Sequence, residues 1–234
     1  GTPQGGPLSP LLSNIMLNEL DKELERRGLP FVRYADDSMI FCKSKRAAMR
    51  VKESITRFIE NVLYLKVNKE KTVVSYVRGV KYLGYSFYVM KGECQLTVHP
   101  KSKAKMKSRL KELTSRSNGW GYAKRKQKLK EYIRGWVGYC HLANMKRLLL
   151  DTDEWLRRRI RMCIWKSWKK VKTKVANLIR CGINKYKAYE WGNTRKGYWH
   201  IANSLILATA ISNNNLRAAG YATLIGTYLE WHPK

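Results

Sequence analysis

Acidic side chains are scarce in this sequence. Seventeen Asp and Glu stand against 47 Lys and Arg, which leaves a formal net charge of +30 over 234 residues. A chain with this surplus repels itself unless a polyanion neutralises it, and the common neutralisers are nucleic-acid phosphates and anionic membrane surfaces. The hydrophobic fraction of 44% is still large enough for packed cores, which argues against intrinsic disorder.

Long apolar runs are also missing. The longest uncharged stretch, residues 197–216, contains His200, Asn203 and three consecutive Asn at 213–215, which the hydrocarbon of a bilayer does not accommodate cheaply. We therefore expect this stretch to form a buried helix, and we expect no membrane partner. Nucleic acid is the favoured polyanion.

Cysteine is sparse and follows no metal-binding or disulfide pattern. Cys42, Cys94, Cys140, Cys163 and Cys181 are odd in number and form no CxxC pair. The four histidines show no ligand spacing with them. These absences favour a cytoplasmic setting, either a bacterial-type cytosol or an organelle matrix. The first residues include neither an initiator Met nor a signal segment, so we expect a fragment of a longer protein.

The positive charge is concentrated in the middle of the chain. Residues 1–100 carry 16 basic and 10 acidic side chains, whereas residues 101–200 carry 29 and 6. Near Pro100 the strand-like alternation also gives way to basic segments of helical period. We place a domain boundary there.

The first hundred residues predict an α+β domain of helices and antiparallel hairpins. Apolar residues recur at steps of three and four over 8–24 and again over 51–62, which predicts two helices. Two strand-like runs, 31–34 and 38–42, flank Ala35-Asp36-Asp37 and predict a hairpin with both carboxylates at its tip. The runs 80–89 and 95–98 flank Lys91-Gly92 and predict another hairpin.

The adjacent carboxylates of Asp36 and Asp37 are the sharpest chemical feature. Two like charges in a tight apolar turn repel unless a cation lies beside them, and hard divalent cations prefer carboxylate oxygens together with water and phosphates. Mg²⁺, with Mn²⁺ as a substitute, fits this donor type and the two-metal chemistry of nucleotidyl transfer. Taken alone, an Asp-Asp pair is more typical of a solvated turn than of a metal site, so the neighbouring motifs must decide.

Several motifs lie in a familiar order around this pair. They are Gln4-Gly5-Gly6-Pro7-Leu8-Ser9-Pro10, Phe31-Val32-Arg33-Tyr34-Ala35-Asp36-Asp37, Leu65–Thr72 and Tyr82-Leu83-Gly84-Tyr85, followed by Trp120-Gly121, Gly135–Tyr139 and Arg195–Trp199. This series resembles the group II intron-encoded reverse transcriptase/maturase family. The resemblance implies a partial palm at 1–99, a basic helical thumb at 100–175 and a maturase-type helical RNA/DNA-binding region at 176–234.

The resemblance also implies roles for individual residues. Asp36 matches the principal catalytic and metal-binding aspartate of its motif, and Asp37 matches an auxiliary one. The nucleotide-binding positions are Gln4, Gly5, Tyr34, Ala35 and Lys71, and the primer grip is Leu83, Gly84 and Tyr85. Ordinary alternatives stay open, because a Gly-Gly turn, a solvated lysine and a core hairpin would look the same.

In the family, a further metal-binding carboxylate and the basic fingers lie upstream of the Gln4-Gly5-Gly6 loop. We therefore expect this chain to be inactive alone and to need an N-terminal fingers/palm segment in the same or a companion chain. The implied partners are an RNA template with a DNA primer, dNTPs and structured intron RNA. No endonuclease pattern follows the maturase-like region.

The basic second part is expected to bind RNA phosphates with a steep salt dependence. RNA fits better than duplex DNA, since no helix-turn-helix or zinc-finger pattern is present. Aromatic residues are interleaved with the charge, but Trp136, Trp155 and Trp165 have the spacing of core residues. The candidate RNA-binding residues are Lys105, Arg109, Lys124, Arg125, Lys126, Arg157, Arg158, Arg159 and Arg161.

Two functions of different classes remain open from the sequence. The first is a fragment of an RNA-directed DNA polymerase with intron maturase function. The second is a non-catalytic RNA-binding splicing cofactor whose palm is only structural. Replacement of Asp36 separates them, because it should abolish polymerisation in the first case and leave RNA affinity intact in the second.

Overall fold

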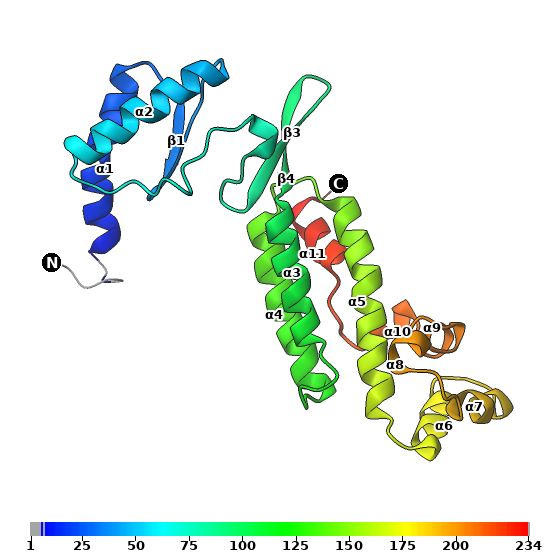
Figure 1. The fold of residues 1–234 in the computed structure, drawn as a ribbon. Coiled ribbons are helices and arrows are strands. Elements are labelled where there is room, and N and C mark those ends of the chain that lie inside the picture. The colour runs from blue at the N-terminus through cyan, green and yellow to red at the C-terminus, as the bar shows by residue number, and fades with distance from the viewer. Residues whose placement is uncertain (1–5, 7, 234) are drawn as a thin grey trace. The chain divides into compact units, whose positions relative to one another are not determined.

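The computed structural model describes residue 6 and residues 8–233. The chain divides into two compact units, Gly1–Cys94 and Gln95–Lys234. Figure 1 shows that the first unit combines helices with a short antiparallel hairpin, whereas the second consists mainly of helices. The predicted fold class, an α+β segment followed by a mainly helical region, is confirmed.

The first unit has a small core between two helices and a hairpin. Its elements are α1 (Ser9–Arg26), β1 (Phe31–Tyr34), β2 (Asp37–Ile40) and α2 (Lys45–Asn61). Leu20 and Leu24 of α1 are buried with Ile55 of α2, and the partly buried Phe31 and Ile40 of the hairpin pack against them. The two helices predicted from apolar periodicity are thus confirmed.

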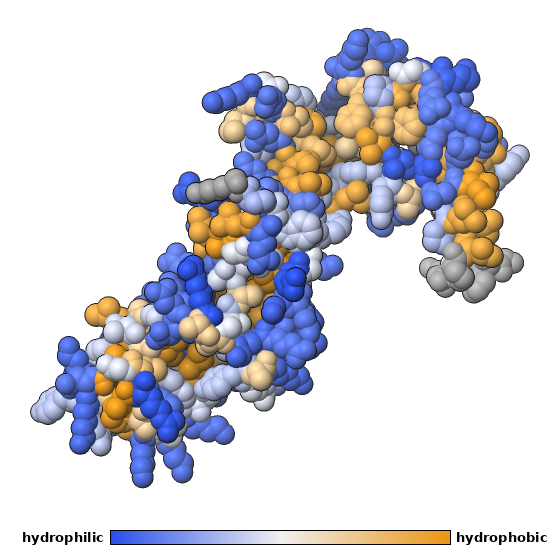
Figure 2. Space-filling view, turned by 180° about the vertical axis from the view of Figure 1, so that it is seen from behind, coloured by the Kyte–Doolittle hydropathy of each residue, from blue (hydrophilic) through white to orange (hydrophobic). Residues whose placement is uncertain are grey.

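The apolar stripe of α1 is buried only at its C-terminal end. Five large apolar side chains in the N-terminal half are 47–60% exposed: Leu8, Leu11, Leu12, Ile15 and Met16. We call these five residues the α1 apolar face. Figure 2 shows this surface in orange at the right-hand side. Apolar patches on one helix face commonly mark an interaction site.

The carboxylates do not both lie at the hairpin tip, so that part of the prediction is wrong. The turn consists of Ala35 and Asp36 alone, and Asp37 is the first residue of β2, paired with Tyr34. Ala35 adopts a left-handed backbone conformation with φ of +53°, which lets two residues close the turn.

The second hairpin begins later than predicted. After the short 3₁₀ helix Val77–Gly79, β3 (Tyr85–Met90) pairs with β4 (Glu93–Val98). The predicted strand from 80 is interrupted because Leu83 and Gly84 take φ of +49° and +83°, and Tyr82 and Tyr85 exchange backbone hydrogen bonds of 3.1 and 2.9 Å around them. The unit boundary falls within β4.

The second unit is built on long helices. They are α3 (Pro100–Leu113), α4 (Tyr122–Cys140) and α5 (Lys146–Ser167), with the C-terminal α11 (Leu224–Trp231) lying between α4 and α5 (Figure 1). Their inward residues, such as Leu110, Ile133 and Leu149, are fully buried. Trp165 is 1% exposed, as predicted for a core residue, whereas Trp136 and Trp155 are only partly buried.

Short helices follow the bundle. They are α6 (Val171–Arg180), α7 (Lys185–Gly192), α8 (Tyr198–Ile201), α9 (Leu205–Ala210) and α10 (Asn213–Ala218). The single buried helix expected over 197–216 is wrong, because polar residues break the stretch: Ser204 precedes α9, and the Ser212 hydroxyl caps α10 by accepting the Asn215 N–H at 3.1 Å. Within the described residues, no helix combines the length and the apolar character needed to cross a membrane.

A buried carboxylate joins α5 to α11. Asp153 is 2% exposed, and its two oxygens accept the backbone N–H groups of Leu224 and Ile225, both at 2.9 Å. These are donors at a helix start that lack intrahelical partners. Burial raises the pKa of Asp153, although the two N–H groups oppose that rise.

We expect Asp153→Ala to destabilise the second unit by about 2–4 kcal/mol, because two buried N–H groups lose their acceptor. Urea unfolding followed by circular dichroism measures the change. Asp151→Ala is the matched control, since Asp151 is exposed on the same helix and its removal should alter stability by less than about 0.5 kcal/mol. Equal effects of the two substitutions would contradict the role of Asp153 in joining α5 to α11.

Candidate functional site

The two-residue turn Ala35–Asp36 is closed by the strand pair Tyr34 and Asp37, and we call the segment Tyr34–Asp37 the carboxylate hairpin. Directly paired residues share one face of a two-stranded sheet, so Tyr34 and Asp37 lie on the same face as the pair Val32 and Met39. Tyr34, Asp36 and Asp37 are all exposed. The two carboxylates are therefore accessible to a ligand.

An ion pair attaches this turn to α1. Arg33 donates from Nε to Asp21 Oδ1 at 2.8 Å and from Nη2 to Asp21 Oδ2 at 2.5 Å. Its Nη1 also donates to Asn14 Oδ1 at 2.9 Å and to the carbonyl of Ala35 at 3.0 Å. The hydrogen bond to Asp21 raises the pKa of Arg33. This network attaches the turn to α1 and occupies the carboxylate of Asp21. The sequence pattern did not reveal the network.

The turn Tyr82–Tyr85 lies beside the carboxylate hairpin. The Tyr82 hydroxyl is 3.5 Å from the carbonyl oxygen of Asp37, 45 positions away in the chain. Burial raises the pKa of Tyr82, and the negative charge of Asp37 adds to that rise. The contact is made by Tyr82 and the backbone of Asp37, so the structure links the turn that contains the predicted primer-grip residues, Leu83 to Tyr85, to the carboxylate hairpin. Tyr82 itself was not predicted as a site residue.

The donor set at the hairpin suits part of a magnesium shell. Mg²⁺ in nucleotide-processing sites is commonly held by one or two carboxylates, with water and phosphate completing the octahedron. Asp36 and Asp37 supply two such carboxylates from exposed positions. Among the described residues, no group of three or more His, Cys, Asp or Glu could hold a metal ion.

The other predicted nucleotide-binding residues are Gln4, Gly5 and Lys71. Gln4 and Gly5 lie outside the described residues. Lys71 is exposed, and its backbone N–H donates to Asn68 Oδ1 at 3.1 Å. Within the described part of the chain, no hydrogen bond or ion pair links Lys71 to the carboxylate hairpin. Its role stays a prediction.

The predicted RNA-binding residues of the second unit differ in availability. Lys105 and Lys124 are exposed, while Arg109 is exposed and pairs with Glu112 at 2.7 Å. Lys126 donates from Nζ to the carbonyl of Ala219 at 2.8 Å, which ties α4 to the segment after α10. The exposed cations can bind phosphates without breaking a tertiary contact.

Four arginines hold the second unit together. Arg125 is 5% exposed and donates to Asn118 Oδ1, and Arg159 donates from Nε to Thr114 Oγ1 at 2.6 Å. Arg161 donates from Nε to the carbonyl of Ile211 at 2.8 Å, and Arg158 stacks on Trp199 at 3.8 Å. Burial lowers the pKa of Arg159 and of Arg161. Arg157, within the same run, has no such partner among the described residues.

Comparisons with known proteins identify both parts of the chain. The family model described as "Reverse transcriptase (RNA-dependent DNA polymerase)" matches residues 1–87. The model described as "Group II intron, maturase-specific domain" matches residues 103–182. The two matches are consecutive and together cover more than half of the chain.

Individual relatives agree with these matches. Protein YkfC of Escherichia coli K12 is 32% identical over 36% of this chain and 32% of its own length. Group II intron-encoded protein LtrA of Lactococcus lactis subsp. cremoris is 29% identical over 38% of this chain and 26% of its own. The retron Ec86 reverse transcriptase of Escherichia coli is 32% identical over 31% and 24%. The chain thus spans about a third or less of each relative. Because the reverse transcriptase match is followed directly by the maturase match, the chain belongs to the group II intron reverse transcriptase/maturase family.

Proposed function

We propose that this chain is part of an RNA-directed DNA polymerase that also acts as an intron maturase. The observation that carries the proposal is the contact between the carboxylate hairpin and the turn Tyr82–Tyr85. Nucleotidyl transfer needs metal-binding carboxylates and a means to hold the primer terminus beside them. These two segments, which contact each other through Tyr82 and Asp37, would supply both.

Each residue of the hairpin has a distinct part in the proposed reaction. Asp36, assisted by Asp37, would hold Mg²⁺ or its substitute Mn²⁺. When bound, the ion would supply Lewis-acid stabilisation of the negative charge that develops as the primer 3′ oxygen joins the α-phosphorus and pyrophosphate leaves. Exposed Tyr34, with the small Ala35, provides the surface beneath the primer end and the incoming dNTP. Leu83, Gly84 and Tyr85 press the primer toward this surface.

The α1 apolar face is the proposed contact for the rest of the palm and fingers. Its five side chains are about half exposed on the helix that Arg33 links to the carboxylate hairpin. Burial of such a face favours association by about 25 cal/mol for each Å² of apolar surface removed from water. An N-terminal fingers/palm segment, in the same or a companion chain, would cover it and complete the metal shell.

The second unit is the proposed RNA-binding part. Its charge requires a polyanion, and exposed Lys105, Arg109 and Lys124 lie on α3 and α4. The family implies intron RNA as the partner, and the primer-template would share the same cationic surface. The assignment of 100–175 as thumb and of 176–234 as a further RNA/DNA-binding region stays a prediction.

Primer extension tests the proposal. The chain is mixed with an N-terminal fingers/palm segment of a family member, and dNTP incorporation on a primed RNA template is followed with and without Mg²⁺. We expect incorporation by the mixture only when Mg²⁺ is present. A mixture that binds RNA with a steep salt dependence but incorporates no nucleotide would refute the polymerase proposal.

A further inference from the structure

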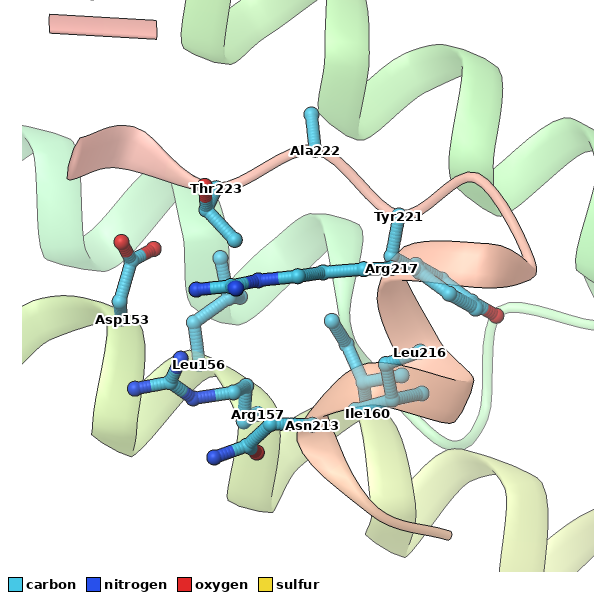
Figure 3. Close-up of a pocket in the computed structure, with 10 residues that line it drawn as sticks. All are labelled: Asp153, Leu156, Arg157, Ile160, Asn213, Leu216, Arg217, Tyr221, Ala222 and Thr223. Atoms are coloured by element: carbon cyan, nitrogen blue, oxygen red, sulfur yellow. The ribbon is translucent and has the colours of Figure 1, made fainter. Parts of the chain in front are cut away.

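A small pocket lies in the second unit between α5 and the segment from α10 to the start of α11. Its floor is apolar, and its polar rim includes Asp153 and Arg157 of α5 and Asn213 and Arg217 of α10. Figure 3 shows the guanidinium groups of Arg157 and Arg217 ending on the side of the pocket where Asp153 lies. Two cations 60 positions apart in the chain thus share one rim.

The one carboxylate of this rim is already in use. Both oxygens of Asp153 accept backbone N–H groups at the start of α11. Arg157 and Arg217 act on Asp153 only through their charge, and among the described residues neither guanidinium makes a hydrogen bond or an ion pair. The two guanidinium groups carry ten N–H bonds, and none of these has an acceptor within the described part of the chain.

A third arginine increases the positive excess. Arg161 donates from Nη2 to Asn213 Oδ1 at 2.8 Å, and the charge of Arg157 contributes to lowering the pKa of Arg161. A third guanidinium group is thus bonded to the asparagine that lies on the pocket rim. The bond from Arg161 uses the Asn213 carbonyl oxygen, so the amide nitrogen of Asn213 remains as a donor beside the two free arginines.

The size of the pocket limits what an anionic ligand can insert. The enclosed space is about 10 Å³, room for roughly one water-sized group. A base or a whole nucleotide does not fit, but a phosphate at the rim can direct its oxygens toward the donors. Guanidinium groups match phosphate oxygens through two parallel hydrogen bonds.

We propose that Arg157 and Arg217, together with the Asn213 amide, bind one backbone phosphate of RNA. This inference rests on the proposed RNA-binding function of the second unit and gives it a specific contact. The contact is independent of base identity, because only a phosphate reaches the donors. It also bridges α5 and α10, so bound RNA would hold the C-terminal segment against the bundle.

The test measures RNA affinity as a function of salt. A fluorescent RNA stem-loop is titrated with the full chain and with Arg157→Gln/Arg217→Gln over a KCl series. Loss of one phosphate contact should make the slope of log Kobs against log[salt] shallower by about one unit. The affinity at low salt should fall about tenfold or more, since charge-assisted hydrogen bonds are lost.

A matched variant separates this site from general electrostatics. Arg134→Gln/Arg147→Gln removes the same charge from exposed positions of α4 and α5 outside the pocket. It should change the slope less than the pocket variant does. Equal slopes for the two double variants would overturn the site while leaving RNA binding by the second unit in place, whereas failure of the unaltered chain to bind RNA would overturn both proposals.

Two further measurements test whether the variants fold and which source of phosphate the site binds. Arg157→Lys/Arg217→Lys keeps both charges near Asp153, so it should fold, retain the salt slope and still lose affinity because the bidentate fork is gone. Wild-type affinity in this variant would overturn the proposal. The proposal would also be overturned if inorganic phosphate raised the melting temperature only when Arg157 and Arg217 are present, while RNA affinity stayed the same with or without them.

Discussion

We expect Asp36→Asn to reduce Mg²⁺-dependent nucleotide incorporation about a thousandfold or more when the chain is complemented with the N-terminal fingers/palm segment. The amide is neutral and binds a hard divalent cation poorly, so the stabilisation that the metal provides, several kcal/mol, is lost from the transition state. Asp36 is exposed in a two-residue turn and accepts no hydrogen bond from the described residues, so the substitution should leave the fold unchanged. Primer extension on an RNA template measures the loss.

The controls for this substitution come from the same chain. Asp37→Asn should cost less activity, because its role is auxiliary, and Asp151→Asn, at an exposed position of α5, should cost none. RNA affinity and urea unfolding of Asp36→Asn should match those of the unaltered chain. If complemented Asp36→Asn polymerises normally, the carboxylate hairpin is structural and the catalytic metal is held elsewhere, which would contradict the role proposed for Asp36.

We expect Leu11→Asp/Ile15→Asp to weaken association with the N-terminal fingers/palm segment by more than about a hundredfold. Leu11 and Ile15 belong to the α1 apolar face, and burial of one such side chain favours association by about 1.5–3 kcal/mol. Charged replacements also carry a desolvation cost at the interface. Co-purification and calorimetric titration of the two segments measure the change, and primer extension should be lost with it.

The same variant should keep the stability of the isolated chain, since its two side chains are about 60% exposed before association. Leu205→Asp is the matched control, because Leu205 is 78% exposed in the second unit and lies outside the proposed contact. Undiminished association of Leu11→Asp/Ile15→Asp would show that the α1 apolar face is not where the segment docks. RNA affinity, which depends on the second unit, should be unaffected in either variant.

Local features of the site were accessible from the sequence because they depend on neighbours along the chain. The helical period over 8–24 predicts α1, and the strand-like runs around Asp36 predict the hairpin that presents it. The exact residues of a turn are harder to predict. The sequence places Asp37 at the tip of the hairpin, whereas the structure has it one residue further on, at the start of β2. The left-handed Leu83 that interrupts the second hairpin has no sequence signal, because leucine rarely adopts that conformation.

The sequence by itself determined the family resemblance, the carboxylate pair and the excess of positive charge that calls for a polyanion. Only the tertiary structure decided which arginines are available to bind RNA. Arg159 and Arg161 form hydrogen bonds to groups about 45–52 positions away, whereas neighbouring Arg157 lies with Arg217 at a pocket rim. It also decided which half of the α1 stripe is covered. Periodicity places a side chain on a face of a helix, but burial and pairing depend on segments that only folding brings there.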